Sequence, residues 1–258
     1  GGRRGPADWS GRVTVIAVGA WRGVGASTTA RLLASAAAVR GRDAWLVEAD
    51  PAGGVLASRA PALAGVDSLG RVAFTPTDDR IEVALQASAR RLGPVSVVTG
   101  PWDSFHAWSA IASPRRPWVD AMRRIGDVVV VDVGSLRGGD VPSWPIIERS
   151  DVLVMVSNPD PAALTSTGAW MGATGQSAPG VAGLSFDTSQ LVVVDTPDHS
   201  TERFGPDVAD ELGGRLAGWW DWDSKVVDHV LRGGSLDHRA TRRHDLVAAA
   251  TSTFDRLI

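Results

Sequence analysis

The sequence contains neither cysteine nor tyrosine, and Lys225 is the only lysine among its 26 basic residues. Without cysteine the chain can form no disulfide, thiolate metal site or cysteine nucleophile. No apolar run approaches the roughly 18 residues that cross a membrane, so we expect no integral membrane segment. The formal net charge of −3 provides no overall basic field that would hold nucleic acid. We therefore expect neither a membrane-spanning protein nor a nucleic-acid-binding one.

Short apolar runs rich in β-branched residues recur along the chain and predict strands buried in a parallel sheet. The runs are RVTVIAVG, AWLVEAD, VSVVTG, DVVVVDVG, DVLVMVSN and LVVVDT. Segments with helical spacing lie between them, for example residues 27–40, 81–92 and 118–125. This alternation predicts an α/β fold with a doubly wound, mostly parallel central sheet flanked by helices. We expect residues 1–10 to be a flexible tail and residues 11–258 to form a single domain.

A glycine-rich stretch, AVGAWRGVGASTTA, follows the first predicted strand and opens the first predicted helix. This is the position of a phosphate-binding loop. Gly23 and Gly25 allow a tight backbone turn whose amides would point at an anion near the helix N-terminus. Ser27 lies where a hydroxyl would bind magnesium, and Ala26 lies where a lysine would neutralise the phosphates. A tight strand-to-helix turn without any ligand explains the glycines equally well.

Two later strands each end in a carboxylate that the parallel sheet brings to the same edge. Asp50 belongs to EADPAG, and Asp132 belongs to VVVVDVGS. Asp50 is expected either to have a catalytic role at a bound nucleotide or to cap the turn before Pro51. Asp132 is expected either to hold magnesium through water or to receive loop amides. For Ser27, the alternative to a metal ligand is an ordinary helix-start residue.

Taken in order, these motifs resemble the ParA/MinD family of deviant-Walker P-loop ATPases, in a degenerate form similar to the CpaE/TadZ or septum-site-determining members. The family loop, Lys-Gly-Gly-Val-Gly-Lys-Thr-Thr, is matched here by WRGVGAST. The expected nucleotide-binding positions are therefore Trp21, Arg22, Gly23, Val24, Gly25, Ala26, Ser27 and Thr28. The resemblance covers about residues 12–250 and implies a P-loop NTPase fold, ATP and Mg as ligands, and a catalytic role for Asp50. It also implies that Ser27 and Asp132 would bind the metal.

The departures from the family loop bear directly on activity. Trp21 replaces the signature lysine that reaches the partner's nucleotide, Arg22 replaces a glycine, and Ala26 replaces the Walker lysine. An alanine cannot offset the charge of a transferring phosphoryl group. The first hypothesis is therefore a pseudo-ATPase that works as a dimerising scaffold or positioning factor in cell division or in pilus or secretion assembly. The alternative is an active switch ATPase in which Arg22 or a partner residue stands in for the lysines.

The resemblance also implies a protein partner, either a second copy of the chain or a related ATPase, together with a protein of a division, pilus or secretion system. It implies a cytoplasmic protein that a partner recruits to the inner face of the membrane. Trp21 is expected either at a dimer interface or folded over its own loop. The arginines of SPRRPW and RRIGD are expected on a solvated helix face, with a patch for DNA or a partner as the alternative, and the five histidines show no metal spacing. The helix after Arg243 is expected to dock on the domain.

Overall fold

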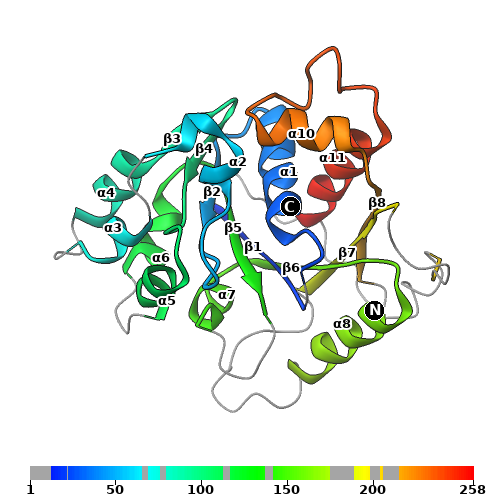
Figure 1. Ribbon diagram of the computed structural model, residues 1–258, viewed down its shortest axis with the longest axis horizontal. Coiled ribbons are helices and arrows are strands. Elements are labelled where there is room, and N and C mark those ends of the chain that lie inside the picture. The colour runs from blue at the N-terminus through cyan, green and yellow to red at the C-terminus, as the bar shows by residue number, and fades with distance from the viewer. Residues whose placement is uncertain are drawn as a thin grey trace, which may run out of the picture.

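The computed structural model describes residues 13–21, 23–65, 69–75, 80–112, 117–136, 142–174, 189–197, 204–205 and 215–258. These residues form one eight-stranded sheet with the order β3-β4-β2-β5-β1-β6-β7-β8 (Figure 1). The strands are β1 (Thr14–Ala20), β2 (Ala44–Glu48), β3 (Arg90–Leu92), β4 (Val95–Val98), β5 (Val128–Ser135), β6 (Val152–Ser157), β7 (Ser189–Asp195) and β8 (Leu216–Asp221). Every neighbouring pair is parallel except β3 with β4. The predicted doubly wound, mostly parallel sheet is thus confirmed.

Helices cover both faces of this sheet. Over the described residues they are α1 (Ala26–Val39), α2 (Leu56–Arg59), α3 (Leu69–Ala73), α4 (Ile81–Ser88), α5 (Ser104–Ala112), α6 (Pro117–Ala121), α7 (Trp144–Glu148), α8 (Pro161–Thr174), α10 (Ser224–Leu231) and α11 (Asp245–Leu257), with short 3-10 turns η1 (Pro61–Leu63) and η3 (Met122–Arg124). Helices α1, α10 and α11 cover one face of the sheet, and helices α3 to α6 cover the other (Figure 1). The chain is therefore a three-layered α/β structure.

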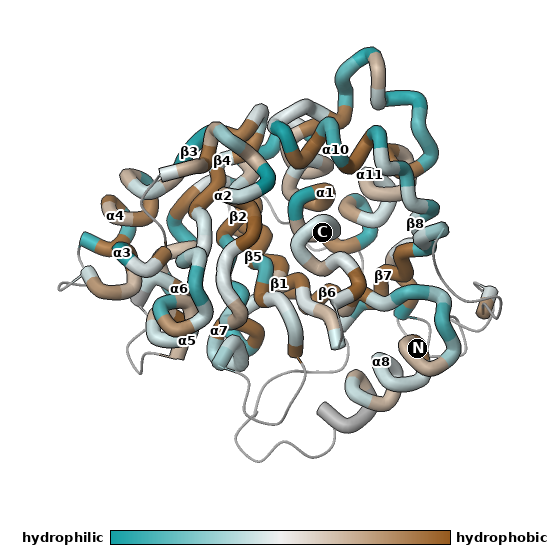
Figure 2. The backbone as a smooth tube through the Cα atoms, in the orientation of Figure 1, coloured by the Kyte–Doolittle hydropathy of each residue, from teal (hydrophilic) through white to brown (hydrophobic). Residues whose placement is uncertain are grey.

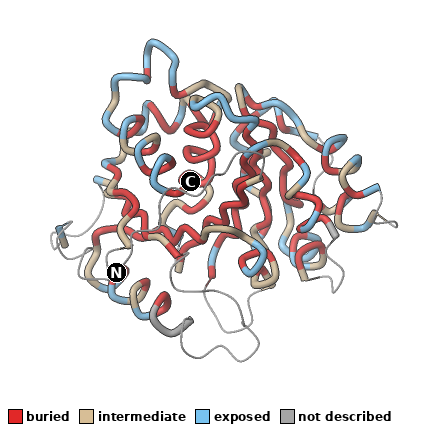
Figure 3. Tube along the Cα trace, turned by 180° about the vertical axis from the view of Figure 1, so that it is seen from behind, coloured by how far each residue is buried: buried red, intermediate tan, exposed pale blue. Residues whose placement is uncertain are grey.

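Alternate residues of the central strands face two separate hydrophobic cores. In β1, Ile16 and Val18 belong to the core beneath α1, α10 and α11. Val15 and Ala17 belong to the core beneath the helices from α3 to α8. This period of two is what a strand covered on both sides requires. Hydrophobic colouring and buried residues accordingly coincide along the strands (Figures 2 and 3).

Three helix predictions can be compared with the structure directly. The helix expected over residues 27–40 is α1. The helix expected over 81–92 is wrong in its last part, because α4 ends at Ser88 and residues 90–92 pair with β4 as the antiparallel strand β3. The helix expected over 118–125 is α6 followed by the 3-10 turn η3. Strand pairing thus overrides the helical spacing of that short segment.

The C-terminal helix α11 packs on the domain, as expected. Its apolar side is buried against β8 and α1 through Leu246, Ala250 and Phe254. Among the described residues, no helix combines the length and the apolar content that crossing a bilayer requires. Residues 1–10, predicted to be a tail, lie outside the described residues.

Candidate functional site at the carboxyl edge of the sheet

The loop between β1 and α1 has the backbone geometry of a tight strand-to-helix turn. Gly25 has a φ of 99°, a left-handed conformation that favours glycine. No atom lies within 4 Å of the position that a Cβ would take at Gly23 or Gly25, so the loop borders open space. Helix α1 begins at Ala26 without a side-chain cap. Its first amides are therefore available to an anion, as the glycine spacing predicts.

Trp21 makes its ring contacts inside the chain. Its ring centroid lies 6.4 Å from that of Trp170 on α8, and Trp170 stacks on Trp144 at 5.6 Å with an interplanar angle of 4°. Trp21 is half-buried against the core beneath these helices. Of the two roles expected for Trp21, this geometry corresponds to packing within its own chain, where Trp21 contacts Trp170 of α8. Arg22, the neighbouring candidate, lies outside the described residues.

Glu48 ends β2 and is fully buried. Its carboxylate accepts hydrogen bonds from the amides of Val55 (2.6 Å) and Leu56 (2.9 Å) and, at its other oxygen, of Gly100 (2.8 Å). Burial raises the pKa of Glu48, and these amides counteract the rise. The sequence motif marks this acidic residue without indicating its role. In the structure it ties the start of α2 to the end of β4.

Asp50 lies over the end of β5. Its carboxylate accepts the amide of Ala52 at 2.8 Å, which is the turn-capping role weighed for it above. A Cβ on Gly134 would lie only 2.1 Å from the Asp50 Cγ, and Gly134 has a φ of 64°. Burial raises the pKa of Asp50. Gly134 is thus the residue whose lack of a side chain permits this position of Asp50, and sequence reasoning missed it.

Asp132 is fully buried near the end of β5. One of its oxygens accepts the amide of Gly134 at 3.1 Å, and the other, Oδ2, has no hydrogen-bond partner. Burial raises its pKa to about 7, the charges of Glu48 and Asp50 add to the rise, and the nearby Ser27 hydroxyl opposes it. A buried oxygen without a partner is costly. The predicted metal residues Ser27 and Asp132 are therefore neighbours, with one oxygen available.

These groups suit magnesium better than they suit phosphate. A hydroxyl and carboxylate oxygens are the ligands that Mg²⁺ prefers, and it commonly takes one or two carboxylates together with substrate phosphates. Over the described residues there is no group of three His, Cys, Asp or Glu side chains that could hold a metal ion alone. Ser27 and Asp132 are the residues that would hold magnesium, supplied together with a nucleotide. Ala26, 8% exposed at the start of α1, brings no cation to that nucleotide.

Several of the arginines and histidines that the sequence singles out have other partners. Arg123 pairs with Asp151 at 3.0 Å, and Arg124 pairs with Glu82 at 3.0 Å, whereas Arg115 and Arg116 lie outside the described residues. The single lysine, Lys225, is exposed in the first turn of α10. His229 and His238 have ring centroids 5.0 Å apart, His244 contacts Asp223, His106 contacts Asp103, and His199 lies outside the described residues. Among the described residues, none of these histidines belongs to a group of three His, Cys, Asp or Glu side chains that could hold a metal ion.

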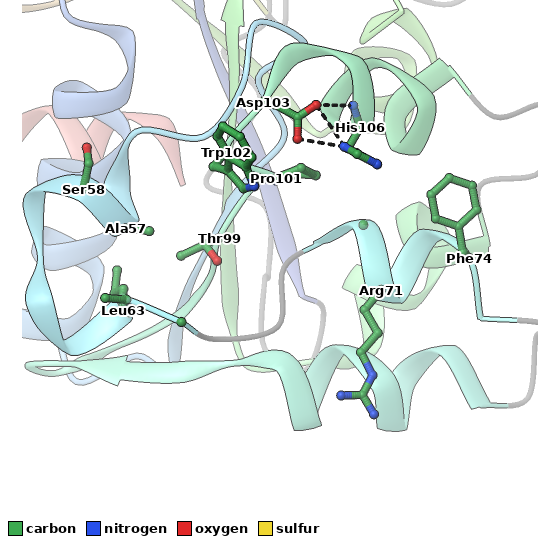
Figure 4. A pocket seen from close by; sticks show the side chains of 14 residues that line it. Ala57, Ser58, Leu63, Arg71, Phe74, Thr99, Pro101, Trp102, Asp103 and His106 are labelled. Carbon is green, nitrogen blue, oxygen red and sulfur yellow. Dashed lines mark hydrogen bonds and ion pairs between the residues drawn. The ribbon is translucent and has the colours of Figure 1, made fainter.

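A hollow at the same edge of the sheet was not anticipated from the sequence. It has a volume of about 870 Å³ and lies at the end of β4, among α2, α3 and the start of α5 (Figure 4). Pro101 and Trp102 lie on one side of it, Ala57 and Leu63 on another and Phe74 on a third. The only sequence signal was the spacing of the aromatic residues in PWDSFHAW.

Comparison with known proteins concerns the fold of the whole chain. No protein-family model matches the sequence, and no curated protein sequence is significantly similar to it. Among solved structures, the cell division ATPase MinD of Pyrococcus furiosus aligns with a TM-score of 0.73 and 18% sequence identity over 95% of this chain and 98% of that one. A ParA family ATPase from Chlorobium tepidum TLS aligns with a TM-score of 0.72 and 16% identity over 95% and 99%.

A third similar structure contains a nucleotide. The septum site-determining protein MinD of Pyrococcus horikoshii OT3, complexed with Mg-ADP, aligns with a TM-score of 0.73 and 16% identity over 95% of each chain. At identities of this size the likeness concerns the three-dimensional structure. Together with the glycine loop and the carboxylates at the strand ends, it identifies this chain as a protein with the fold of the MinD and ParA ATPases.

Proposed function

We propose that this chain is a catalytically degenerate ParA/MinD-like pseudo-ATPase that works as a dimerising scaffold or positioning factor. The observation that carries the proposal is the charge at the loop edge. Ala26 begins α1 at the position where the ParA/MinD family has its Walker lysine. The charges of Glu48 and Asp50 contribute to the raised pKa of Asp132, so the three carboxyl groups lie close together. No basic side chain of the described residues is among the groups that shift the pKa of Asp132.

This charge pattern disfavours phosphoryl transfer. Catalysis of that reaction consists almost entirely of positioning and of neutralising charge on the phosphoryl oxygens. In a nucleotide complex, the carboxylates of Glu48, Asp50 and Asp132 would add negative charge at this edge of the sheet. Magnesium held by Ser27 and Asp132 would offset part of this charge when a nucleotide brings it. The cation that would act on the transferring group itself is missing at Ala26.

The partner side of the proposal comes from the fold. The similar structures include a cell division ATPase, plasmid partition proteins and a MinC:MinD complex from Aquifex aeolicus. By analogy we propose that residues 11–258 act as one unit that associates with a second copy or with a related ATPase. The complex would serve a division, pilus or secretion system in the cytoplasm, and a partner would recruit it to the inner face of the membrane.

A specific observation favours the alternative, an active switch ATPase. The buried Oδ2 atom of Asp132 lacks a partner, and α1 begins without a side-chain cap; a Mg-nucleotide site would use both features. In that case Arg22 or a residue of the partner would replace the missing lysines. Such a chain would bind ATP and cycle between a monomer and a dimer.

Nucleotide binding and phosphate release distinguish the two functions. We expect ATP turnover by the wild-type protein to equal that of Asp50→Ala, because neither provides a cation for the γ phosphate. Calorimetric titration with Mg-ATP and a continuous phosphate assay measure both quantities on the full chain. Turnover clearly above background that disappears in Asp50→Ala would reject the pseudo-ATPase and support the switch.

A further inference from the structure

Three exposed aromatic residues follow one another from the segment after β4 into α5, and we call them the aromatic stripe. They are Trp102, Phe105 and Trp108, with exposed fractions of 86%, 75% and 49%. Phe105 and Trp108 lie on neighbouring positions of the surface of α5, and Trp102 lies just before the first turn of that helix. The opposite side of α5 is buried through Ala107 and Ile111. Phe105 and Trp108 thus lie on the solvent side of α5, and Trp102 extends this exposed surface just before the helix.

Local structure does not explain why Trp102 is exposed. Asp103 caps α5, because its carboxylate accepts the amide of His106 at 3.0 Å. Trp102 directly precedes this cap, at the position from which an apolar side chain often packs on the fourth residue of a helix. That residue is Ala107, which is fully buried, whereas Trp102 projects into solvent. Large apolar patches of this kind on a protein surface mark interaction sites.

The hollow at the end of β4 adjoins the stripe and shares Trp102 with it (Figure 4). Phe74, 61% exposed, lies across the hollow from Pro101 and Trp102. The same face therefore carries both projecting rings and an apolar depression of about 870 Å³. A surface with both features can be complementary to a second copy of itself, which is what a twofold interface requires.

The exposed aromatic area covers most, but not all, of one side of a standard dimer interface. Fully buried aromatic side chains contribute about 150–250 Å² each, so the exposed parts of Phe74 and the aromatic stripe amount to roughly 400–700 Å². The largest apolar patch of an ordinary monomer is about 300–600 Å², and a stable interface buries about 800 Å² per partner. The rings and the margins of the hollow together approach this requirement.

We propose that the aromatic stripe and the adjoining hollow form a twofold interface between two copies of this chain, and that this interface forms without nucleotide. In the sheet, β4 is separated from β1 by β2 and β5, so the contact does not use the loop of Gly23 and Gly25. Trp21, the other candidate for an interface, already contacts Trp170 in its own chain. The inference specifies the partner for the proposed scaffold and rests on that function only for its biological role.

The test is the mass of the full chain in solution, measured by sedimentation velocity over a range of protein concentrations with and without Mg-ATP. We expect a dimer whose dissociation constant is the same in both conditions. Phe105→Arg should raise that constant at least about tenfold, because it places a charge at an apolar contact. Val83→Arg is the matched control, since Val83 is 64% exposed on α4 outside the stripe and the hollow. Circular dichroism would verify that both variants fold.

A second readout uses the absence of cysteine. Ser104→Cys on α5 and Ser252→Cys on α11 each introduce the only thiol of the chain, and oxidation should cross-link the α5 variant in preference to the α11 variant. A wild-type monomer at all concentrations, a dimer that survives Phe105→Arg, or preferential cross-linking through α11 would overturn the proposal. These outcomes are independent of the ATPase assay, because an active ATPase can dimerise through α5 and a pseudo-ATPase can be monomeric.

Discussion

The buried carboxyl group of Asp132 should cost the folded protein stability at neutral and alkaline pH. Its side chain is fully buried, one oxygen accepts a single amide at 3.1 Å, and the other has no partner. Glu48 and Asp50 add unfavourable charge. Asp132→Asn keeps an acceptor for the Gly134 amide and removes the charge. We therefore expect the variant to be more stable than the wild type above pH 7.

The raised pKa of Asp132 gives the size and the sign of this effect. Folding raises the pKa from its ordinary 3.8 to about 7, so the folded chain binds this proton more tightly than the unfolded chain. The stabilisation that comes from this tighter proton binding is fully present below pH 3.8 and is lost as the pH rises through about 7. At about 1.4 kcal/mol for each pH unit, the full penalty is about 4 kcal/mol, of which about 2–3 kcal/mol develops between pH 5 and pH 8.

Urea unfolding at pH 5 and pH 8, followed by circular dichroism, measures the difference. The free energy of unfolding of Asp132→Asn should exceed that of the wild type by a margin that grows by about 2–3 kcal/mol between these pH values. Asp255→Asn is the control. The hydrogen bond from Arg40 lowers the pKa of Asp255, so its contribution is lost only when the pH falls below the ordinary range. The difference in free energy of unfolding between Asp255→Asn and the wild type should stay constant from pH 5 to pH 8.

Two outcomes would refute this reasoning. If Asp132→Asn is less stable than the wild type at pH 8, the carboxylate makes favourable contacts that outweigh its burial. If the margin does not change between pH 5 and pH 8, Asp132 titrates near its ordinary pKa. Either result would also weaken the proposal for the loop edge, which depends on uncompensated negative charge there.

Three further predictions concern the residues around the loop. Ala26→Lys should tighten Mg-ATP binding by about 1.5–3 kcal/mol, measured by calorimetry, because one set of charged hydrogen bonds is recovered; no binding at all would mean that the loop is closed. Trp21→Ala should lower the free energy of unfolding by about 1–3 kcal/mol through lost ring packing, with no change in mass by sedimentation, and a lower mass would instead make Trp21 an interface residue. Gly134→Ala should destabilise the protein by about 1–3 kcal/mol in urea unfolding, since its Cβ would meet Asp50 at a positive φ, whereas Gly23→Ala, with open space around it, should be tolerated; equal effects would contradict this loop geometry.

Much of the fold was predictable from local patterns. Each of the six apolar runs is a strand, because a strand covered on both faces needs a continuous apolar sequence. The strands β3 and β8 were not predicted. β3 has only three residues and continues a helical pattern, and β8 contains Gly218 between apolar residues at the edge of the sheet. The strand structure of β3 depends on antiparallel pairing with β4, which follows directly after Gly93 and Pro94, and that of β8 depends on pairing with β7.

The candidate site was predictable where it depends on the ends of strands. Gly25 has the left-handed conformation that the loop spacing indicates, and Asp50 and Asp132 lie at neighbouring strand ends. Parallel strands end at one edge, so their order in the sheet is enough to bring these residues together. Whether a nucleotide binds there stays a prediction, because the sequence indicates only which charges are missing.

The sequence by itself determined the strands, the glycine turn and the missing lysines, because these depend on residue type and spacing over short distances. Only the tertiary structure decided what individual side chains contact. It turned Trp21 towards Trp170, enclosed Glu48 among three amides, and left Trp102 and Phe105 in solvent. The physical reason is that burial depends on which distant segments pack together. A tryptophan in the sequence has the same apolar surface whether the fold covers it or exposes it.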